Sequence, residues 1–396
     1  MELFGHFEVF YSLGCRASRF YQILLPELTY PPPFGPAMPT LHASHLTDRH
    51  SHSRLVALSR CLGITLFAAL AVNAPTSGQP PTAAPSAEKE APSPDAKELK
   101  LKTSDGVELA VQYFAVAGKE KPAATVILVH DLGSSSDALV PLAKTLQRDG
   151  CAVLVPDMRG HGESSVEAYK KAAADGNQSK LLKVADFKAM AATGGGRVRG
   201  QSDFRGDIEA VRKWIKEQAD DGKLDLDKLV VVGSGLGAAV ATTWTVADAA
   251  WPAIASGVQG GQVRGLILVD PAFATKGFII GPALAAEPVK TKIPIMILAG
   301  TASRDAGKIF DQLKRSRPTA WFDSRLYDAK ERRNTSPAKD SAASLLYVEV
   351  NARDRTGHPL GGDALASLTS SDPQQRTPAA FIAAFVKAIV DRPLHR

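Results

Sequence analysis

One stretch, 228–241, constrains the fold more than any other part of the chain. A β-branched run at 229–232 predicts a buried strand. Gly-Ser-Gly-Leu-Gly follows at 233–237, and a run of small residues begins at 238. Glycine accepts strained backbone angles and lets a helix approach a strand closely. The stretch therefore predicts a strand, a sharp turn and a helix packed almost against the strand.

The turn follows the G-x-S-x-G pattern of a nucleophile elbow except at its centre. The central position, from which a hydroxyl would project over the sheet, is Gly235. A phosphate-binding loop is disfavoured, because the spacing is neither G-x-G-x-x-G nor G-x-x-x-x-G-K-[ST]. The remaining alternative is a glycine-rich turn unrelated to catalysis, and the flanking chain argues against it. The sequence predicts the architecture of a nucleophile turn without the nucleophile.

Length and composition favour one large α/β domain with appendages. The chain has 396 residues, of which 44% are hydrophobic, and this is ample material for a core. Its net charge of +6 is spread out, without a dense block of Lys and Arg paired with aromatics. No nucleic-acid partner is therefore expected. Cys15, Cys61 and Cys151 show no metal-ligand spacing. We expect no metal, no cofactor and no disulfide framework.

Two segments near the N-terminus are predicted to be unfolded. Residues 1–53 lack periodicity and contain a His-rich run at 42–52. A metal-binding tract is one interpretation of that run, but a disordered leader is favoured. Met38 is an alternative start, which would place earlier residues upstream of the protein. Residues 75–96, rich in Pro and Ala, cannot bury enough apolar surface to fold and are predicted to be a linker.

Between these segments, 54–74 is predicted to be a secretory signal peptide. Two arginines precede an apolar run at 61–70, which is too short to cross a bilayer comfortably. Small-residue cleavage sites follow, ending at Ala71 and at Ala74. The mature protein is then expected to be exported, to the periplasm, the cell envelope or the extracellular space. It is expected to keep no stable membrane span.

Residues 97–396 are predicted to form one α/β domain, with a polar insertion at about 165–202 as a candidate lid. Helices are expected after the glycine turn and from Asp207, which we expect to cap its helix. Alternating buried strands and helices indicate a mostly parallel central sheet with helices on both faces. The strands are predicted at 98–102, 107–114, 124–129, 152–155, 229–232, 265–269, 293–298 and 345–350, and further helices at about 137–148 and 377–390.

The motifs, in this order, resemble those of the α/β-hydrolase superfamily across roughly 98–392, especially its serine-aminopeptidase and lysophospholipase-like members. D-M-R-G-H-G-E-S at 157–164 is close to the family's D-x-R-G-x-G-x-S signature and is the most specific match. H-D-L-G at 130–133 resembles the family's His-Gly oxyanion turn. A-G-T-A-S at 299–303 resembles the turn that delivers the catalytic acid, and T-G-H-P at 356–359 resembles the histidine loop.

This resemblance implies roles for a few residues. His358 takes the position of the base. The acid position itself falls on a serine, so Asp305, two residues further on, or Asp270, at the end of the preceding strand, is the candidate partner of His358. The backbone N–H groups of Leu132 and Leu236 are candidates for an oxyanion hole, because backbone donors do not depend on side chains.

With Gly235 at the nucleophile position, an enzyme is not the favoured interpretation. The favoured one is an inactive or impaired homologue that binds a small molecule or a protein of unknown identity. One alternative is an active esterase or peptidase using an altered site, with Ser234 or a water activated by His358 as nucleophile. The other is a structural cell-envelope protein. An apolar pocket at the carboxyl end of the sheet would favour binding over a structural role.

Export predicts a defined N-terminus. The mature protein, recovered from the outer fractions of its native cell, should begin directly after Ala71 or Ala74, because both follow the small-residue pattern that signal peptidases cleave. N-terminal sequencing measures this directly. Recovery of an intact chain from the cytosol, starting at Met1 or Met38, would contradict the prediction.

Overall fold

The computed structural model describes residues 96–392 with short gaps at 117, 119–120, 167–169, 172–173, 194–196, 199–200, 203–205, 252–259 and 371–375. The predicted leader, signal peptide and almost all of the linker lie outside the described residues. Within the described part of the chain, no helix has both the length and the apolar character needed to cross a membrane.

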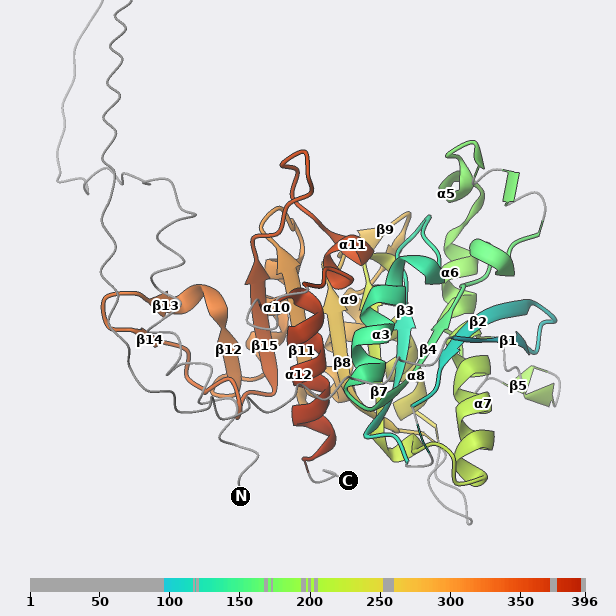
Figure 1. The fold of residues 1–396 in the computed structure, drawn as a ribbon, viewed down its shortest axis with the longest axis horizontal. Helices are drawn as coiled ribbons and strands as arrows, with labels where there is room; N and C mark the ends of the chain where they lie inside the picture. Colours follow the sequence, from blue (N-terminus) through green and yellow to red (C-terminus); the bar gives the residue numbers. More distant parts are fainter. Residues whose placement is uncertain are drawn as a thin grey trace, which may run out of the picture. The chain divides into compact units, whose positions relative to one another are not determined.

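A nine-stranded sheet runs through the domain (Figure 1). Its first two strands and their junction to β4 are antiparallel, and all later neighbours pair in parallel. In spatial order the strands are β1 (Lys97–Lys102), β2 (Glu108–Phe114), β4 (Cys151–Pro156), β3 (Ala124–Val129), β7 (Leu229–Ser234), β8 (Val263–Val269), β11 (Ile295–Gly300), β15 (Leu345–Val350) and β12 (Trp321–Asp323).

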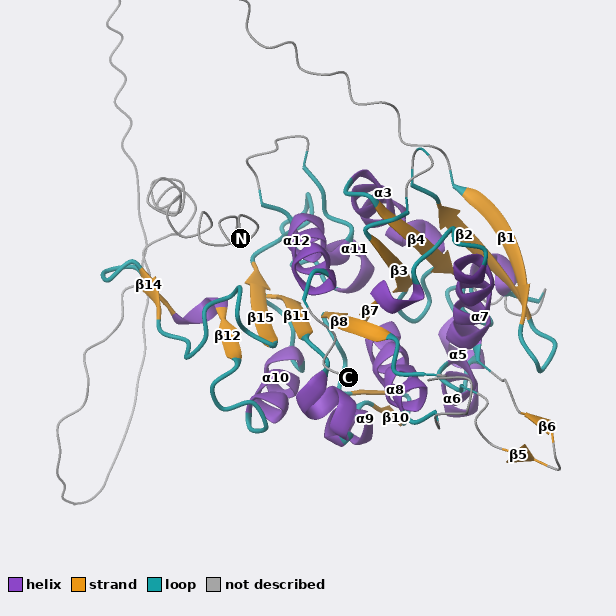
Figure 2. Cartoon of the chain, turned by 90° about the horizontal axis from the view of Figure 1, so that it is seen from below, coloured by secondary structure: helices purple, strands orange, loops and turns teal. Residues whose placement is uncertain are grey.

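Helices cover both faces of this sheet (Figure 2). They are α3 (Val140–Arg148), α5 (Gln178–Leu181), α6 (Val184–Met190), α7 (Asp207–Asp220), α8 (Leu236–Ala249), α9 (Gly281–Ala285), α10 (Ala306–Lys314), α11 (Gly362–Ala366) and α12 (Pro378–Val390). The described residues also contain three short strand pairs: β5 (Arg197–Val198) with β6 (Gln201–Ser202), β9 (Ala274–Thr275) with β10 (Phe278–Ile279), and β13 (Tyr327–Asp328) with β14 (Arg333–Asn334).

The sheet divides the core into two apolar clusters, and β3 contributes side chains to both. Its side chains alternate: Val126 and Leu128 join the cluster under α3 and α12, whereas Ile127 and Val129 join the cluster under α7, α8 and α10. All four are buried because both faces of a parallel strand are covered by helices. This arrangement confirms the predicted fold class, a mostly parallel sheet with helices on both faces.

Two local expectations need correction. The helix expected from 137 begins as a 3₁₀ turn, η1 (Ser136–Leu139), before α3 starts. The expectation that Asp207 caps α7 is wrong: Gly206 is the N-cap, and it makes no side-chain capping bond. The Asp207 carboxylate instead accepts hydrogen bonds from the backbone N–H and Nε of Arg159, both at 2.8 Å. A guanidinium in reach is a stronger partner for this buried carboxylate than a helix N–H.

The insertion expected to be polar contributes to the core. Leu182, Phe187 and Met190 are each at most 1% exposed and belong to the cluster under α8. The Phe187 ring also packs edge-on against Phe278 of β10, with 6.1 Å between ring centroids. These described residues of the insertion are therefore anchored by apolar contacts, and the role of a lid stays a prediction.

A buried arginine joins distant parts of the second half of the domain. Arg317 is 3% exposed, and burial lowers the pKa of its guanidinium to about 10. It donates to the backbone oxygens of Val289, Lys290 and Ile293, around the π-helical turn η4 (Pro288–Lys292), at 2.7 to 3.0 Å. It also donates to the carbonyl and hydroxyl of Ser344, just before β15.

Replacing this arginine should cost much of the domain's stability. In Arg317→Met the buried carbonyls lose their donors at about 1–3 kcal/mol each, so the free energy of unfolding should fall by roughly 3 kcal/mol or more. Urea denaturation measures this. The matched control is Arg315→Met, which alters an exposed side chain two residues away and should change the value by only about 0.5 kcal/mol. Equal losses in both variants would contradict the role given to Arg317.

Candidate functional site

The glycine turn lies between β7 and α8 and has the sharp geometry that the sequence predicts. Gly235 has φ 52° and ψ −117°, a left-handed region that favours glycine. The helix behind it lies close to the sheet: a Cβ on Gly237 would stand 2.4 Å from the carbonyl oxygens of Val129 and His130. Only glycine permits this approach, which brings the end of β3 beside the start of α8.

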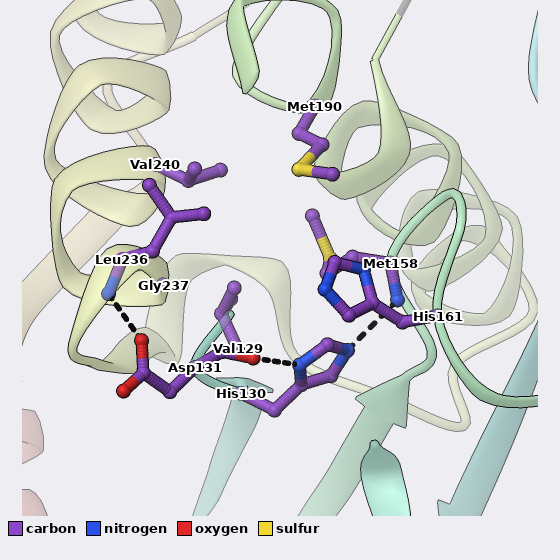
Figure 3. Close-up of a pocket in the computed structure, with 9 residues that line it drawn as sticks. All are labelled: Val129, His130, Asp131, Met158, His161, Met190, Leu236, Gly237 and Val240. Atoms are coloured by element: carbon purple, nitrogen blue, oxygen red, sulfur yellow. Dashed lines mark hydrogen bonds between the residues drawn. The ribbon is translucent and has the colours of Figure 1, made fainter. Parts of the chain in front are cut away.

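The space above Gly235 is filled by the side chain of Asp131. A Cβ built on Gly235 would lie 2.0 to 2.2 Å from the Asp131 carboxylate atoms. Figure 3 shows this carboxylate below the first turn of α8, directed at the backbone nitrogen of Leu236. The site therefore has a carboxylate from the loop after β3 where an elbow side chain would begin.

The two predicted oxyanion-hole donors converge on a single atom. The backbone N–H groups of Leu132 and Leu236 each donate to Oδ1 of Asp131, both at 2.7 Å. These short distances are typical of hydrogen bonds to an ionised acceptor. In a hydrolase, paired donors of this kind hold the oxygen on which negative charge develops. Here they hold a carboxylate of the chain itself.

A second aspartate holds the backbone of Asp131 in place. The Asp131 N–H faces both carboxylate oxygens of Asp363, at 3.2 and 3.1 Å, and the buried Ser234 hydroxyl donates to the same carboxylate. Burial raises the pKa of the Asp131 carboxyl above its usual value, and the charge of Asp363 adds to this. The bonds from Leu236 and Leu132 act in the opposite direction but do not cancel the effect.

The structure does not bring His358 together with either candidate acid. Its side chain is 80% exposed, and Nδ1 lies 2.6 Å from the Thr356 hydroxyl and 3.8 Å from an Asp354 oxygen. Among the described residues, no hydrogen bond joins His358 to Asp270 or to Asp305. The expectation of a hydrogen-bonded pair is therefore not met, because the loop closes on itself through Asp354, which also accepts the backbone N–H of His358.

The two candidate acids are occupied elsewhere. Asp305 precedes α10, accepts the backbone N–H of Phe273 at 3.0 Å and pairs with Lys308 at 3.2 Å. Asp270 has a positive φ of 45° and accepts the backbone N–H of Gly362 at 3.2 Å. Asp270 thus reaches the edge of the site, whereas Asp305 serves the local structure of its loop.

Two glycines lie between Asp270 and the elbow. A Cβ on Gly361 would stand 2.4 Å from Oδ2 of Asp270, and a Cβ on Gly362 would stand 3.2 Å from Oδ2 of Asp131. The backbone at these two glycines therefore lies close to both aspartates, and a side chain at either position would meet a carboxylate.

Two buried histidines line the small cavity beside Asp131 (Figure 3). The cavity has a volume of about 10 Å³ and is lined by Val129, His130, Asp131, Met158, His161, Met190, Leu236, Gly237 and Val240. Nε2 of His130 accepts the N–H of Met158, and Nε2 of His161 accepts the N–H of Gly133, both at 3.1 Å. Each ring thus needs an unprotonated Nε2 and acts as a neutral acceptor.

The D-M-R-G-H-G-E-S signature at 157–164 is a structural junction. The Asp157 carboxylate accepts the backbone N–H groups of Ser136 and Glu163, at 2.6 and 2.9 Å. Ser164 donates to the Asp157 carbonyl and accepts the N–H of Ala110 in β2. The signature therefore connects the antiparallel hairpin to η1, the turn before α3. Met158 and His161 of the signature also line the cavity beside Asp131.

Nothing in the described residues resembles a metal centre, since no three His, Cys, Asp or Glu side chains gather in a way that could hold an ion. The residues that the sequence analysis missed are Asp131 and Asp363. Asp131 had a visible signal, because it stands where the resemblance has the glycine of a His-Gly turn. Asp363 had none, because its position beside Ser234 depends on a contact across 129 positions in the chain.

The buried His161 predicts a loss of stability in acid. Burial, with a contribution from His130, lowers its pKa from 6.5 to about 3. Its stabilising contribution is complete above about pH 6.5 and is lost as the pH falls towards 3, because the unfolded chain then binds a proton that the folded chain refuses. Urea unfolding between pH 7.5 and 4.5 should show a decline of up to about 1.4 kcal/mol per pH unit from this group.

His161→Gln keeps an acceptor for Gly133 but cannot titrate, so it should lose this part of the decline. His358→Gln, on an exposed loop outside the cavity, is the control and should keep the decline of the unaltered protein. The same slope in the unaltered chain and in His161→Gln would contradict the assignment.

Known proteins share this architecture. Residues 126–394 match the model of the family described as the alpha/beta hydrolase family, and no curated protein matches the chain. Similar solved structures include an esterase of Pyrococcus furiosus, with 16% identity over 65% of this chain and 83% of that chain and a TM-score of 0.40. A dienelactone hydrolase from Anabaena variabilis has 15% identity over 75% of this chain and 97% of that chain, with a TM-score of 0.42. The family match covers well over half of the sequence, and the chain belongs to the alpha/beta hydrolase family.

Proposed function

We propose that this protein is a catalytically inactive member of the family that works outside the cytoplasm as a binding module. On this proposal Gly235 replaces the nucleophile of a serine-aminopeptidase or lysophospholipase-like ancestor. The ligand is a small molecule or a protein. The export part of the proposal rests on the basic flank, short apolar run and cleavage sites at 54–74.

One observation carries the proposed inactivity: the Asp131 carboxylate stands where a side chain on residue 235 would begin, 2.0 Å from its Cβ position. Acyl transfer needs an attacking group, a base to take its proton and free donors for the oxyanion. Gly235 offers no attacking group. The exposed His358 is bound within its own loop, and the paired donors already have an acceptor.

The neighbouring hydroxyl is a poor substitute. Ser234 is 1% exposed, belongs to the end of β7 and directs its hydroxyl to Asp363. The hydroxyl is thus already hydrogen-bonded to a carboxylate, and it stands one position before the centre of the elbow pattern. This disfavours the alternative of an esterase or peptidase that attacks with Ser234.

The cavity limits what a small ligand could be. Its volume of about 10 Å³ is room for about one water molecule, far below the roughly 300–1,000 Å³ of pockets that take drug-sized ligands. Apart from Asp131 and the two neutral histidines, its lining is apolar. The cavity as it stands therefore holds no small-molecule ligand, which favours a protein ligand or the structural alternative over a small-molecule ligand bound there.

A serine-directed probe tests the inactivity. The purified domain, incubated with a fluorophosphonate, should stay unlabelled, because no activated hydroxyl stands at the elbow. Hydrolysis of p-nitrophenyl esters should remain at the rate of the buffer. Ser234→Ala is the matched variant and should give the same background as the unaltered chain. Stoichiometric labelling mapped to Ser234, or ester hydrolysis that Ser234→Ala abolishes, would establish the active-hydrolase alternative instead.

A further inference from the structure

We propose that Asp131 is an internal ligand of the elbow, whose carboxylate fills the paired N–H site of Leu132 and Leu236 and closes that site to small carboxylates from solution. This deepens the proposed function, because it names an occupant for the site and the chemical class that could replace it. The contact is autoinhibitory: the chain blocks its own anion site.

The contact has the geometry of a bound ligand. Leu132 lies in the loop after β3 and Leu236 begins α8, yet both N–H groups point at one oxygen, each 2.7 Å away. Because the two N–H groups come from separate elements, they fix both the position of the bound oxygen and the side from which it is approached. The N-terminus of the fourteen-residue helix α8 adds a favourable field for a negative charge.

Glycines at 235 and 362 leave room for the Asp131 carboxylate where other residues would have a Cβ. Gly235 has no Cβ, and any Cβ there would lie 2.0 Å from Oδ1 of Asp131. On the other side, a Cβ on Gly362 would lie 3.2 Å from Oδ2. Glycines at these two positions provide the volume that the carboxylate group occupies.

The backbone of Asp131 is fixed by hydrogen bonds that do not involve its own carboxylate. The Asp131 N–H donates to Asp363, and the Ser234 hydroxyl donates to Asp363 as well. The backbone carbonyl of Asp131 lies 2.8 Å from Nδ1 of His130. Removal of the carboxylate alone would therefore leave the loop anchored and would open a void of the same shape and the same hydrogen-bonding character.

Formate is the smallest probe for that void. In Asp131→Ala, labelled with ¹⁵N-leucine, the amide signals of Leu132 and Leu236 should shift saturably as formate is added, with half-saturation in the millimolar range (roughly −4 kcal/mol, as for a 1 mM ligand). The melting temperature of this variant should rise with formate and not with chloride. The unaltered protein should show neither response, because its own carboxylate fills the site.

Two controls separate site filling from a loss of charge. Asp131→Asn keeps an oxygen acceptor of the same shape and should stay insensitive to formate. Asp225→Ala removes another carboxylate that accepts a backbone N–H, that of Asp227 at 3.0 Å, and should leave the two leucine signals where they are. Equal formate responses in the unaltered chain and in Asp131→Ala, or no saturable response in Asp131→Ala, would overturn the proposal.

A second variant covers the case in which Asp131→Ala does not fold. Gly235→Ala keeps the carboxylate but places a methyl group where that carboxylate lies, so both leucine signals should move relative to the unaltered chain. They should stay insensitive to formate, because the methyl group takes the volume that formate would need. Unchanged leucine signals in folded Gly235→Ala would overturn the proposal. Formate binding is reversible, whereas fluorophosphonate labelling is covalent, so this proposal and the proposed inactivity can fail independently.

Discussion

The close approach of α8 to the sheet is the constraint on which the rest of the site depends. A Cβ on Gly233 would lie 2.4 Å from the carbonyl oxygen of Gly237, and a Cβ on Gly237 would meet the end of β3. Because both positions are glycine, the start of the helix lies beside the loop after β3. The N–H groups of Leu132 and Leu236 converge for that reason alone, whichever atom they bind.

The same geometry explains why one carboxylate can accept both N–H groups. The N–H groups at the start of α8 and in the loop after β3 need an acceptor, since a buried unpaired donor costs about 1–3 kcal/mol. Asp131 supplies the acceptor, and glycines at 235 and 362 supply the volume. The burial that raises the pKa of Asp131 is the cost of this arrangement, and the two backbone bonds offset part of it.

Much of the fold could be predicted from the sequence because its signals are local. The β-branched runs predicted the parallel strands, and the last one, Leu345–Val350, has the bounds that were expected. The edge strand β12 was missed, because three residues are too few to show an alternation of apolar and polar side chains. At the site, the glycine turn was readable, whereas the position of His358 was not. His358 is hydrogen-bonded within its own loop, to Asp354 and Thr356, and no sequence pattern predicts these contacts.

The signature at 157–164 has a consequence for how such chains are classified. Arg159 pairs with Asp105 in the β1–β2 turn and with Asp207 in α7, while Asp157 and Ser164 connect further backbone groups. These contacts are needed to assemble the scaffold whether or not it turns over a substrate. A search keyed to this octapeptide would therefore report the scaffold and not the chemistry at the elbow. The residues on which that chemistry depends lie at the elbow and in the loop that faces it.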